Sequence, residues 1–285
     1  MAGGRPAGRR LRTLALAGAA LLAAGLASTL LFTGPAASSE RDWAADQAVA
    51  PRVSFLDDSV RIEGLRDFRH RPGGGFTPGY RDESYPLAQV TRVWFGLAPF
   101  AHRWRGLGHT FLSFEMADGR FLAVSVEARR EEGESYSLVR GLLRGFEITY
   151  VLATEEDVVG LRAVRGDTLY LYPSTATPEQ ARALLVDVLR RAEALRLSPE
   201  FYNTVLNNCA TNLRDHVNRV ASDPLPVGWG LIFPGYSDAL ALEHRLLDTN
   251  LPLEEARARF RVDERARRAL DRGGGFSTAI RGGAF

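Results

Sequence analysis

The single cysteine of the chain, Cys209, is a residue that could act as a nucleophile. It lies in the run TVLNNCATNLRDHV, where asparagines give way to a helical pattern, so we expect the thiol at or near a helix N-terminus. There the helix dipole and the free amides favour the reactive thiolate. The alternative is a small, inert hydrophobic residue buried in the core. A lone cysteine excludes an intramolecular disulfide and a multi-thiolate metal site.

A thiol nucleophile needs a base within hydrogen-bond reach and a group that orients this base. His216 follows Cys209 by seven residues on the same expected helix. At about 1.5 Å per residue it stands roughly 10 Å away, too far to take the proton. Three other histidines lie in segments where the sequence shows no orienting acid: His70, His102 and His244. His109 is the remaining candidate for the base.

The clearest local pattern in the chain is the alternation of HTFLSFEM and FLAVSVE, which predicts a β-hairpin. A two-residue turn would scatter the apolar residues over both faces of the hairpin. A three-residue loop with Gly119 in the left-handed conformation instead pairs Leu112 with Val124 on one core face. This register places His109 opposite Glu127, whose carboxylate would fix the imidazole tautomer. The alternative is that the polar side of the hairpin faces water.

Other elements predict a mixed α+β domain. We expect strands over 89–95, 147–152 and 168–172, and a helix that Thr177 caps and that ends at Ser198-Pro199. A second helix is expected from Cys209 to about Val220. The arginine-rich stretch 251–270 reads as a solvated helical face.

The N-terminal segment is expected to carry the chain into or across a membrane. Residues 14–32 form an uncharged segment that is long enough to span about 30 Å of hydrocarbon. Four arginines precede this segment. This pattern predicts a single-pass inner-membrane protein with a cytoplasmic N-terminus and a periplasmic body. The alternative is a cleaved signal peptide and secretion to the periplasm. The expected organisation is an anchor or signal over 1–36, a tether over 37–58 and one domain over 59–285.

Charge and motifs exclude several classes of function. The 36 basic residues are all arginine and 34 acids nearly cancel them, so the charge of +2 does not favour a nucleic-acid partner. The sequence lacks the GxSxG, HExxH, GxxxxGK[ST] and paired CxxC motifs. We therefore expect no metal and no cofactor.

Four runs of the sequence resemble one known family over roughly residues 60–280. These runs are HTFLSFEMADGRFLAVSVEARREEGESYS, GLLRGFEITYVLATEEDVVGLR, PEFYNTVLNNCATNL and PGYSDAL. They are similar to the Lnb N-terminal periplasmic domain family of bacterial envelope proteins. That family looks like a circularly permuted relative of the NlpC-type, papain-like peptidases and acyltransferases, in which a strand-borne histidine precedes the cysteine.

The resemblance implies a permuted papain-like fold, with an antiparallel sheet packed on the helix that carries the cysteine. It implies Cys209 as the nucleophile, His109 as the base and Glu127 as its orienting partner. Tyr202 and Asn208 match the motif around the cysteine and are expected to have supporting roles.

Two functions remain open at this point. The first is a membrane-tethered thiol hydrolase or acyltransferase that acts on an amide or ester in envelope material, such as a peptidoglycan peptide, a lipid or an acylated protein. The second is a non-catalytic envelope module that binds a partner or assists assembly through the same cleft.

Overall fold

The computed structural model describes residues 12, 16–19, 21–22, 25, 36–100, 105–272 and 274–282. The chain divides into two compact units, Met1–Ala37 and Ser38–Phe285. Among the described residues, no helix has both the length and the apolar character needed to cross a membrane. Most of the segment 14–32, for which a membrane span was predicted, lies outside the described residues.

The second unit is built on a large, mostly antiparallel sheet. Its strands are β1 (Arg52–Leu56), β2 (Ser59–Arg66), β5 (Tyr80–Pro86), β6 (Val90–Pro99), β7 (Gly108–Met116), β8 (Phe121–Arg129), β9 (Glu147–Ala153) and β10 (Tyr170–Pro173). The order is β1-β2-β9-β8-β7-β6-β10, and β5 pairs with β2. β2 and β9 run parallel, and the other pairs in this sheet are antiparallel. β3 (Arg69–His70) and β4 (Phe76–Thr77) form a separate two-stranded sheet.

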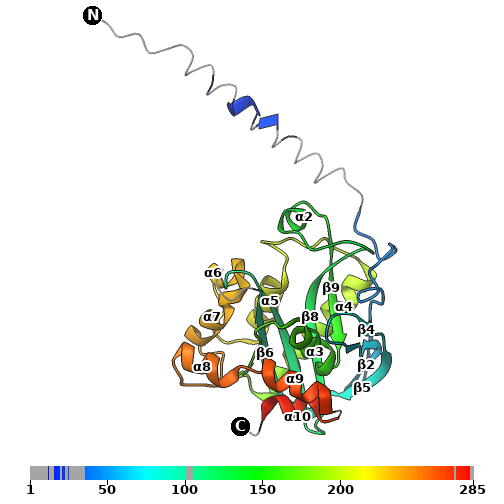
Figure 1. Cartoon of the computed structure of the whole chain (residues 1–285), viewed down its shortest axis with the longest axis vertical. Helices are drawn as coiled ribbons and strands as arrows, with labels where there is room; N and C mark the ends of the chain where they lie inside the picture. Colours follow the sequence, from blue (N-terminus) through cyan, green and yellow to red (C-terminus); the bar gives the residue numbers. More distant parts are fainter. Residues whose placement is uncertain are drawn as a thin grey trace, which may run out of the picture. The chain divides into compact units, whose positions relative to one another are not determined.

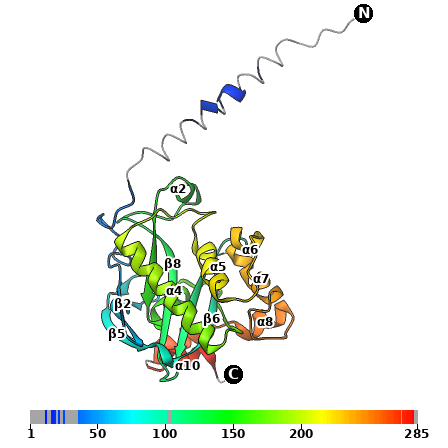
Figure 2. The same ribbon diagram turned by 180° about the vertical axis from the view of Figure 1, so that it is seen from behind.

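Helices cover both faces of the large sheet. They are α2 (Leu138–Leu142), α3 (Glu155–Arg165), α4 (Pro178–Leu197), α5 (Cys209–Val220), α6 (Trp229–Ile232), α7 (Ser237–Glu243), α8 (Leu253–Phe260), α9 (Asp263–Arg272) and α10 (Phe276–Arg281), with short 3₁₀ turns η1 (Leu87–Gln89) and η2 (Pro234–Tyr236). Figure 1 shows α3, α9 and α10 in front of the sheet, and Figure 2 shows α4 and α5 on the other face. The antiparallel sheet is therefore packed on the helix that begins with Cys209.

The hairpin β7–β8 has the predicted register. Leu112 pairs with Val124, and Gly119 in the connecting loop has a φ of 82°. The polar side of the hairpin does not face water, because α3 covers it. Ser113, for example, is fully buried and its hydroxyl donates to the Glu155 carboxylate at 2.6 Å.

The capping signals of the sequence also hold. Thr177 and Gln180 form the capping box at the start of α4. The apolar stripe of this helix joins the same core cluster as Leu112 and Cys209. α5 begins at Cys209 and ends at Val220, as expected.

Two segments differ from expectation. Residues 37–58 were predicted as a tether, yet 38–58 belong to the folded unit. β1 pairs with β2, and Trp43 is buried with the Arg129 guanidinium over its ring, 4.2 Å from the ring centroid. The stretch 251–270 is more than a solvated face. Apolar residues such as Val262 and Ala266, spaced among the arginines, are buried against the sheet, because α9 covers the edge of the core.

Candidate active site

Cys209 is the first residue of α5, and a capping box holds it there. Asn208 is the N-cap: its Oδ1 accepts from the Thr211 N–H at 2.9 Å, and the Thr211 Oγ1 accepts from the Asn208 N–H at 2.8 Å. Asn208 Nδ2 also donates to the Thr204 carbonyl at 2.7 Å. These bonds satisfy end groups that the helix itself leaves unpaired. The expectation of a thiol at a helix N-terminus is therefore confirmed.

The Cys209 thiol is buried among apolar side chains and beside Thr110 of β7. Burial raises the pKa of Cys209, the backbone and side chain of Thr110 partly oppose this rise, and the negative charge of Glu127 adds to it. At neutral pH the resting group is thus the thiol. The Thr110 hydroxyl is itself buried beside the thiol.

A hydrogen-bonded chain joins the other two predicted residues. His109 Nε2 lies 2.6 Å from the Ser125 hydroxyl, which donates to Glu127 Oε1 at 2.7 Å. Nε2 is also 3.2 Å from the same Glu127 oxygen. The expected approach of His109 to Glu127 is confirmed, and Ser125 adds a second link between them.

The protonation states of this chain follow from burial and charge. Burial lowers the pKa of His109 to about 4, although Glu127 opposes the change. Burial would raise the pKa of Glu127, but the His109 and Arg162 charges and the Ser125 hydroxyl outweigh it and lower that pKa to about 2. At neutral pH the pair is a neutral imidazole and a carboxylate. Such an imidazole can accept a proton.

His109 and Cys209 approach the cleft from opposite sides of β7. Successive strand residues alternate between faces, so Thr110 points toward Cys209 while His109 points toward α3. The β7–β8 pairing ends at Phe111 and Ser125. A cleft of about 710 Å³ opens beyond this point, and its lining includes both residues.

All five residues predicted from the sequence line this cleft: His109, Glu127, Tyr202, Asn208 and Cys209. A family model described as the Lnb N-terminal periplasmic domain matches residues 76–233, which is more than half of the chain. The chain belongs to this family. Comparisons with curated proteins and with solved structures found no match.

The five cleft residues lie within the matched part of this Lnb N-terminal periplasmic domain. Tyr202 forms an apolar wall near the thiol: it is buried, its N–H donates to the Phe146 carbonyl at 2.9 Å, and its ring packs edge-on against Tyr136. Among the described residues, no group of three or more acidic, histidine or cysteine side chains is placed to hold a metal ion.

Sequence reasoning missed two residues of this candidate site. Ser125 bridges His109 and Glu127, and Arg162 of α3 contacts Glu127 Oε1 at 3.4 Å. The alternation of the hairpin put Ser125 on the same face as His109, which was a usable signal. No local pattern pointed to Arg162, because it reaches the site through the packing of α3 on the sheet.

Two other histidines have partners that keep them from the cleft. His70 was expected to lack an orienting acid, but its Nε2 lies 2.8 Å from the buried Asp157 carboxylate. The two meet because α3 packs beside β3, far along the chain. His216 contacts the Tyr150 hydroxyl and the Asp187 carboxylate, which is consistent with a structural role.

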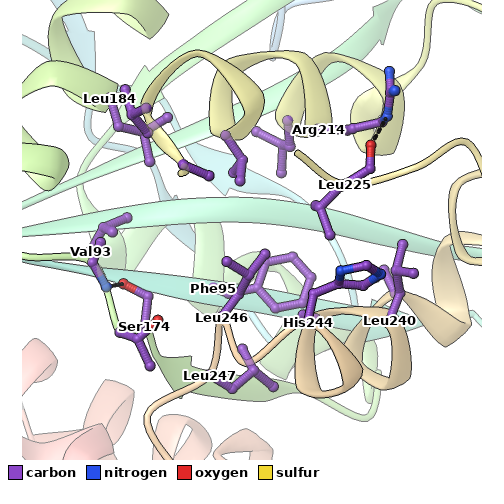
Figure 3. A pocket seen from close by; sticks show the side chains of 18 of the residues that line it. Val93, Phe95, Ser174, Leu184, Arg214, Leu225, Leu240, His244, Leu246 and Leu247 are labelled. Carbon is purple, nitrogen blue, oxygen red and sulfur yellow. Dashed lines mark hydrogen bonds between the residues drawn. The ribbon is translucent and has the colours of Figure 1, made fainter. Parts of the chain in front are cut away.

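A second cavity of the Lnb domain lies on the Cys209 side of the sheet. Its volume is about 410 Å³, and Thr110 and Ala210 are among its lining residues. Figure 3 shows side chains such as Phe95, Leu184 and Leu240 around a common space. The cavity is mainly apolar and lies next to the thiol, because it contacts both Thr110, which is beside Cys209, and Ala210, which follows Cys209 in the chain.

Proposed function

We propose that this Lnb N-terminal periplasmic domain is a thiol hydrolase or acyltransferase of the cell envelope. The carrying observation is that Cys209, at the N-terminus of α5, and the chain of His109, Ser125 and Glu127 line one cleft. A nucleophile, a base and an orienting acid are the components of thiol catalysis. The order of a strand-borne histidine before a helix-borne cysteine supports a permuted papain-like arrangement.

In this mechanism Cys209 attacks the carbonyl carbon of an amide or ester. As the Sγ–C bond forms, the proton of the thiol passes across the cleft that both residues line to His109, and His109 returns it to the leaving amine or alcohol as the substrate bond breaks. The resulting thioester is opened by water in hydrolysis or by an amine or hydroxyl in acyl transfer. Glu127 stabilises the imidazolium that forms between these steps.

Two groups beside the thiol suit a negatively charged carbonyl oxygen. The positive end of the α5 dipole lies at Cys209, and the buried Thr110 hydroxyl beside the thiol has a proton to donate. The apolar cavity supports an acyl group as the part of the substrate that forms the thioester, because apolar lining favours a hydrocarbon chain. A lipid or an acylated protein fits this cavity better than a peptidoglycan peptide.

The location of the reaction is part of the same proposal. The family is described as periplasmic. Residues 14–32 would tether the domain to the inner membrane, with the N-terminus in the cytoplasm, or would be removed after export. Envelope lipids and acylated proteins would be within reach in either case.

Alkylation of the thiol tests the proposal directly. Iodoacetamide should modify Cys209 in the wild type, and His109→Ala should slow this modification at least tenfold, as measured by mass spectrometry over time. His216→Ala is the matched control, because it removes a buried histidine outside the cleft. Equal rates in the wild type and His109→Ala would refute the base assignment.

A second candidate function is a non-catalytic binding module. The observation that favours it is the burial of Cys209 within the core cluster, which raises its pKa. In this case Cys209→Ala should complement a deletion strain as well as the wild type does. Loss of complementation, with an unchanged circular dichroism spectrum, would favour catalysis.

A further inference from the structure

The α3 side of the cleft carries two arginines whose charges are poorly matched by the protein. Arg162 is buried, and its two charge contacts are long: 3.4 Å to Glu127 and 4.0 Å to Asp167. Its Nε–H is buried and has no hydrogen-bond partner among the described residues. Buried donors of this kind are usually satisfied in native proteins, so an oxyanion bound in the cleft would satisfy this one.

Arg165 extends this arrangement toward solvent. It follows Arg162 by three residues on α3, a spacing that puts two side chains next to each other on a helix. Its exposed side chain forms no hydrogen bond or ion pair with any other described residue. Partial desolvation at the cleft and the like charge of Arg162 lower the pKa of the exposed Arg165, although Asp167 and Glu127 oppose this change.

The other arginines of the cleft already have close partners. Arg66 forms a two-pronged ion pair with Asp157, with contacts of 2.8 and 2.9 Å. Arg130 contacts the Asp46 carboxylate at 3.0 Å. Unmatched guanidinium charge is thus concentrated on the last turns of α3, within the same cleft that Cys209 and His109 line.

We infer that Arg162 and Arg165 form a subsite for an oxyanion, a carboxylate or a phosphate, on the substrate that Cys209 attacks. Guanidinium groups bind both kinds of oxyanion through paired N–H donors, and a ligand between the two arginines would relieve their repulsion. The inference rests on the proposed function only in assigning the oxyanion to the substrate of the thiol. It adds that this substrate carries a negative charge as well as the acyl group.

Binding of simple anions to the full-length protein tests the subsite without any reaction at the thiol. Inorganic phosphate and acetate are each titrated at constant ionic strength, and the shift of Tm is followed by differential scanning fluorimetry. At least one anion should raise the Tm of the wild type, and Arg165→Gln should weaken the apparent affinity at least threefold. Stabilisation by phosphate alone would point to a phosphate ester, stabilisation by acetate alone to a carboxylate, and stabilisation by both to a subsite that accepts either oxyanion.

The matched control is Arg272→Gln, which removes an exposed arginine outside the cleft. It should bind the anion as the wild type does. The inference is overturned by any of three results: no stabilisation of the wild type, equal affinity in Arg165→Gln, or equal weakening in both variants. Iodoacetamide labelling of the same samples separates the two proposals, since loss of the His109 effect would reject the catalytic role while anion binding persisted.

Discussion

The Ser125 hydroxyl stands between His109 and Glu127, 2.6 Å from the imidazole Nε2 and 2.7 Å from the carboxylate oxygen. A serine hydroxyl has one proton, and Glu127 is ionised and can only accept, so Ser125 donates to Glu127. Ser125 must then accept from Nε2–H. The neutral His109 is therefore the Nε2–H tautomer, and its Nδ1 carries the lone pair that can take a proton.

Ser125→Ala should weaken the base without removing it. The direct contact of His109 to Glu127 at 3.2 Å remains, but the tautomer loses one of its two supports. We expect about tenfold slower alkylation of Cys209, equivalent to the roughly 1.4 kcal/mol of one net hydrogen bond. Ser113→Ala is the control: this serine lies on the same strand face but bonds to Glu155, so its loss should spare the rate. An unchanged rate in Ser125→Ala would contradict the tautomer assignment.

Glu127→Gln should lower the pKa of Cys209. The Glu127 charge disfavours the thiolate, so its removal stabilises the thiolate relative to the thiol. The midpoint of the alkylation rate against pH should move to lower pH, even if the loss of the oriented base slows the reaction near neutrality. Glu264→Gln, an exposed substitution on α9, should leave the midpoint in place. A midpoint that stays fixed or rises in Glu127→Gln would count against the electrostatic link.

Stability should fall as pH drops from 6.5 toward 4, partly because of His109. The folded-state pKa of about 4 lies below the ordinary value of 6.5, so the unfolded chain binds a proton in this window that the folded protein does not. The contribution of His109 to the free energy of unfolding is fully present above pH 6.5 and is about 2 to 3 kcal/mol smaller at pH 4.5. Urea unfolding at pH 7.5 and 4.5 should show a smaller pH effect in His109→Gln. An identical pH dependence in both proteins would mean that His109 does not have this low pKa.

Asn208→Ala should cost stability and reactivity together. Loss of the N-cap bond to Thr211 lowers the free energy of unfolding by about 1 kcal/mol and loosens the helix end that holds Cys209. Thr177→Ala removes the equivalent cap of α4, away from the cleft, and provides a matched comparison. Urea unfolding should show similar losses in both variants, whereas only Asn208→Ala should change the alkylation rate. Equal alkylation rates would show that the cap has no role in placing the thiol.

Local patterns in the sequence were sufficient where neighbouring residues decide the structure. Alternation and the position of Gly119 predicted the hairpin register, and capping residues predicted the starts of α4 and α5. Other features depended on distant contacts. The tether interpretation of 37–58 was wrong because the low hydrophobicity of that stretch gave no sign that β1 would pair with β2. The alternating sequence of the hairpin is the same whether its polar face contacts water or α3, so the sequence did not predict that α3 covers this face.

By itself, the sequence determined that Cys209 starts a helix and that His109 lies close to Glu127 at the open end of the hairpin, since both depend on short-range geometry. Only the tertiary structure decided that these residues line one cleft from opposite sides of β7, with Ser125 as a bridge and Arg162 behind Glu127. The physical reason is packing. The helices packed on each face of the sheet supply residues of the site, and α3 and α5 come from separate parts of the chain. Local sequence patterns therefore do not show that these helices meet at one cleft.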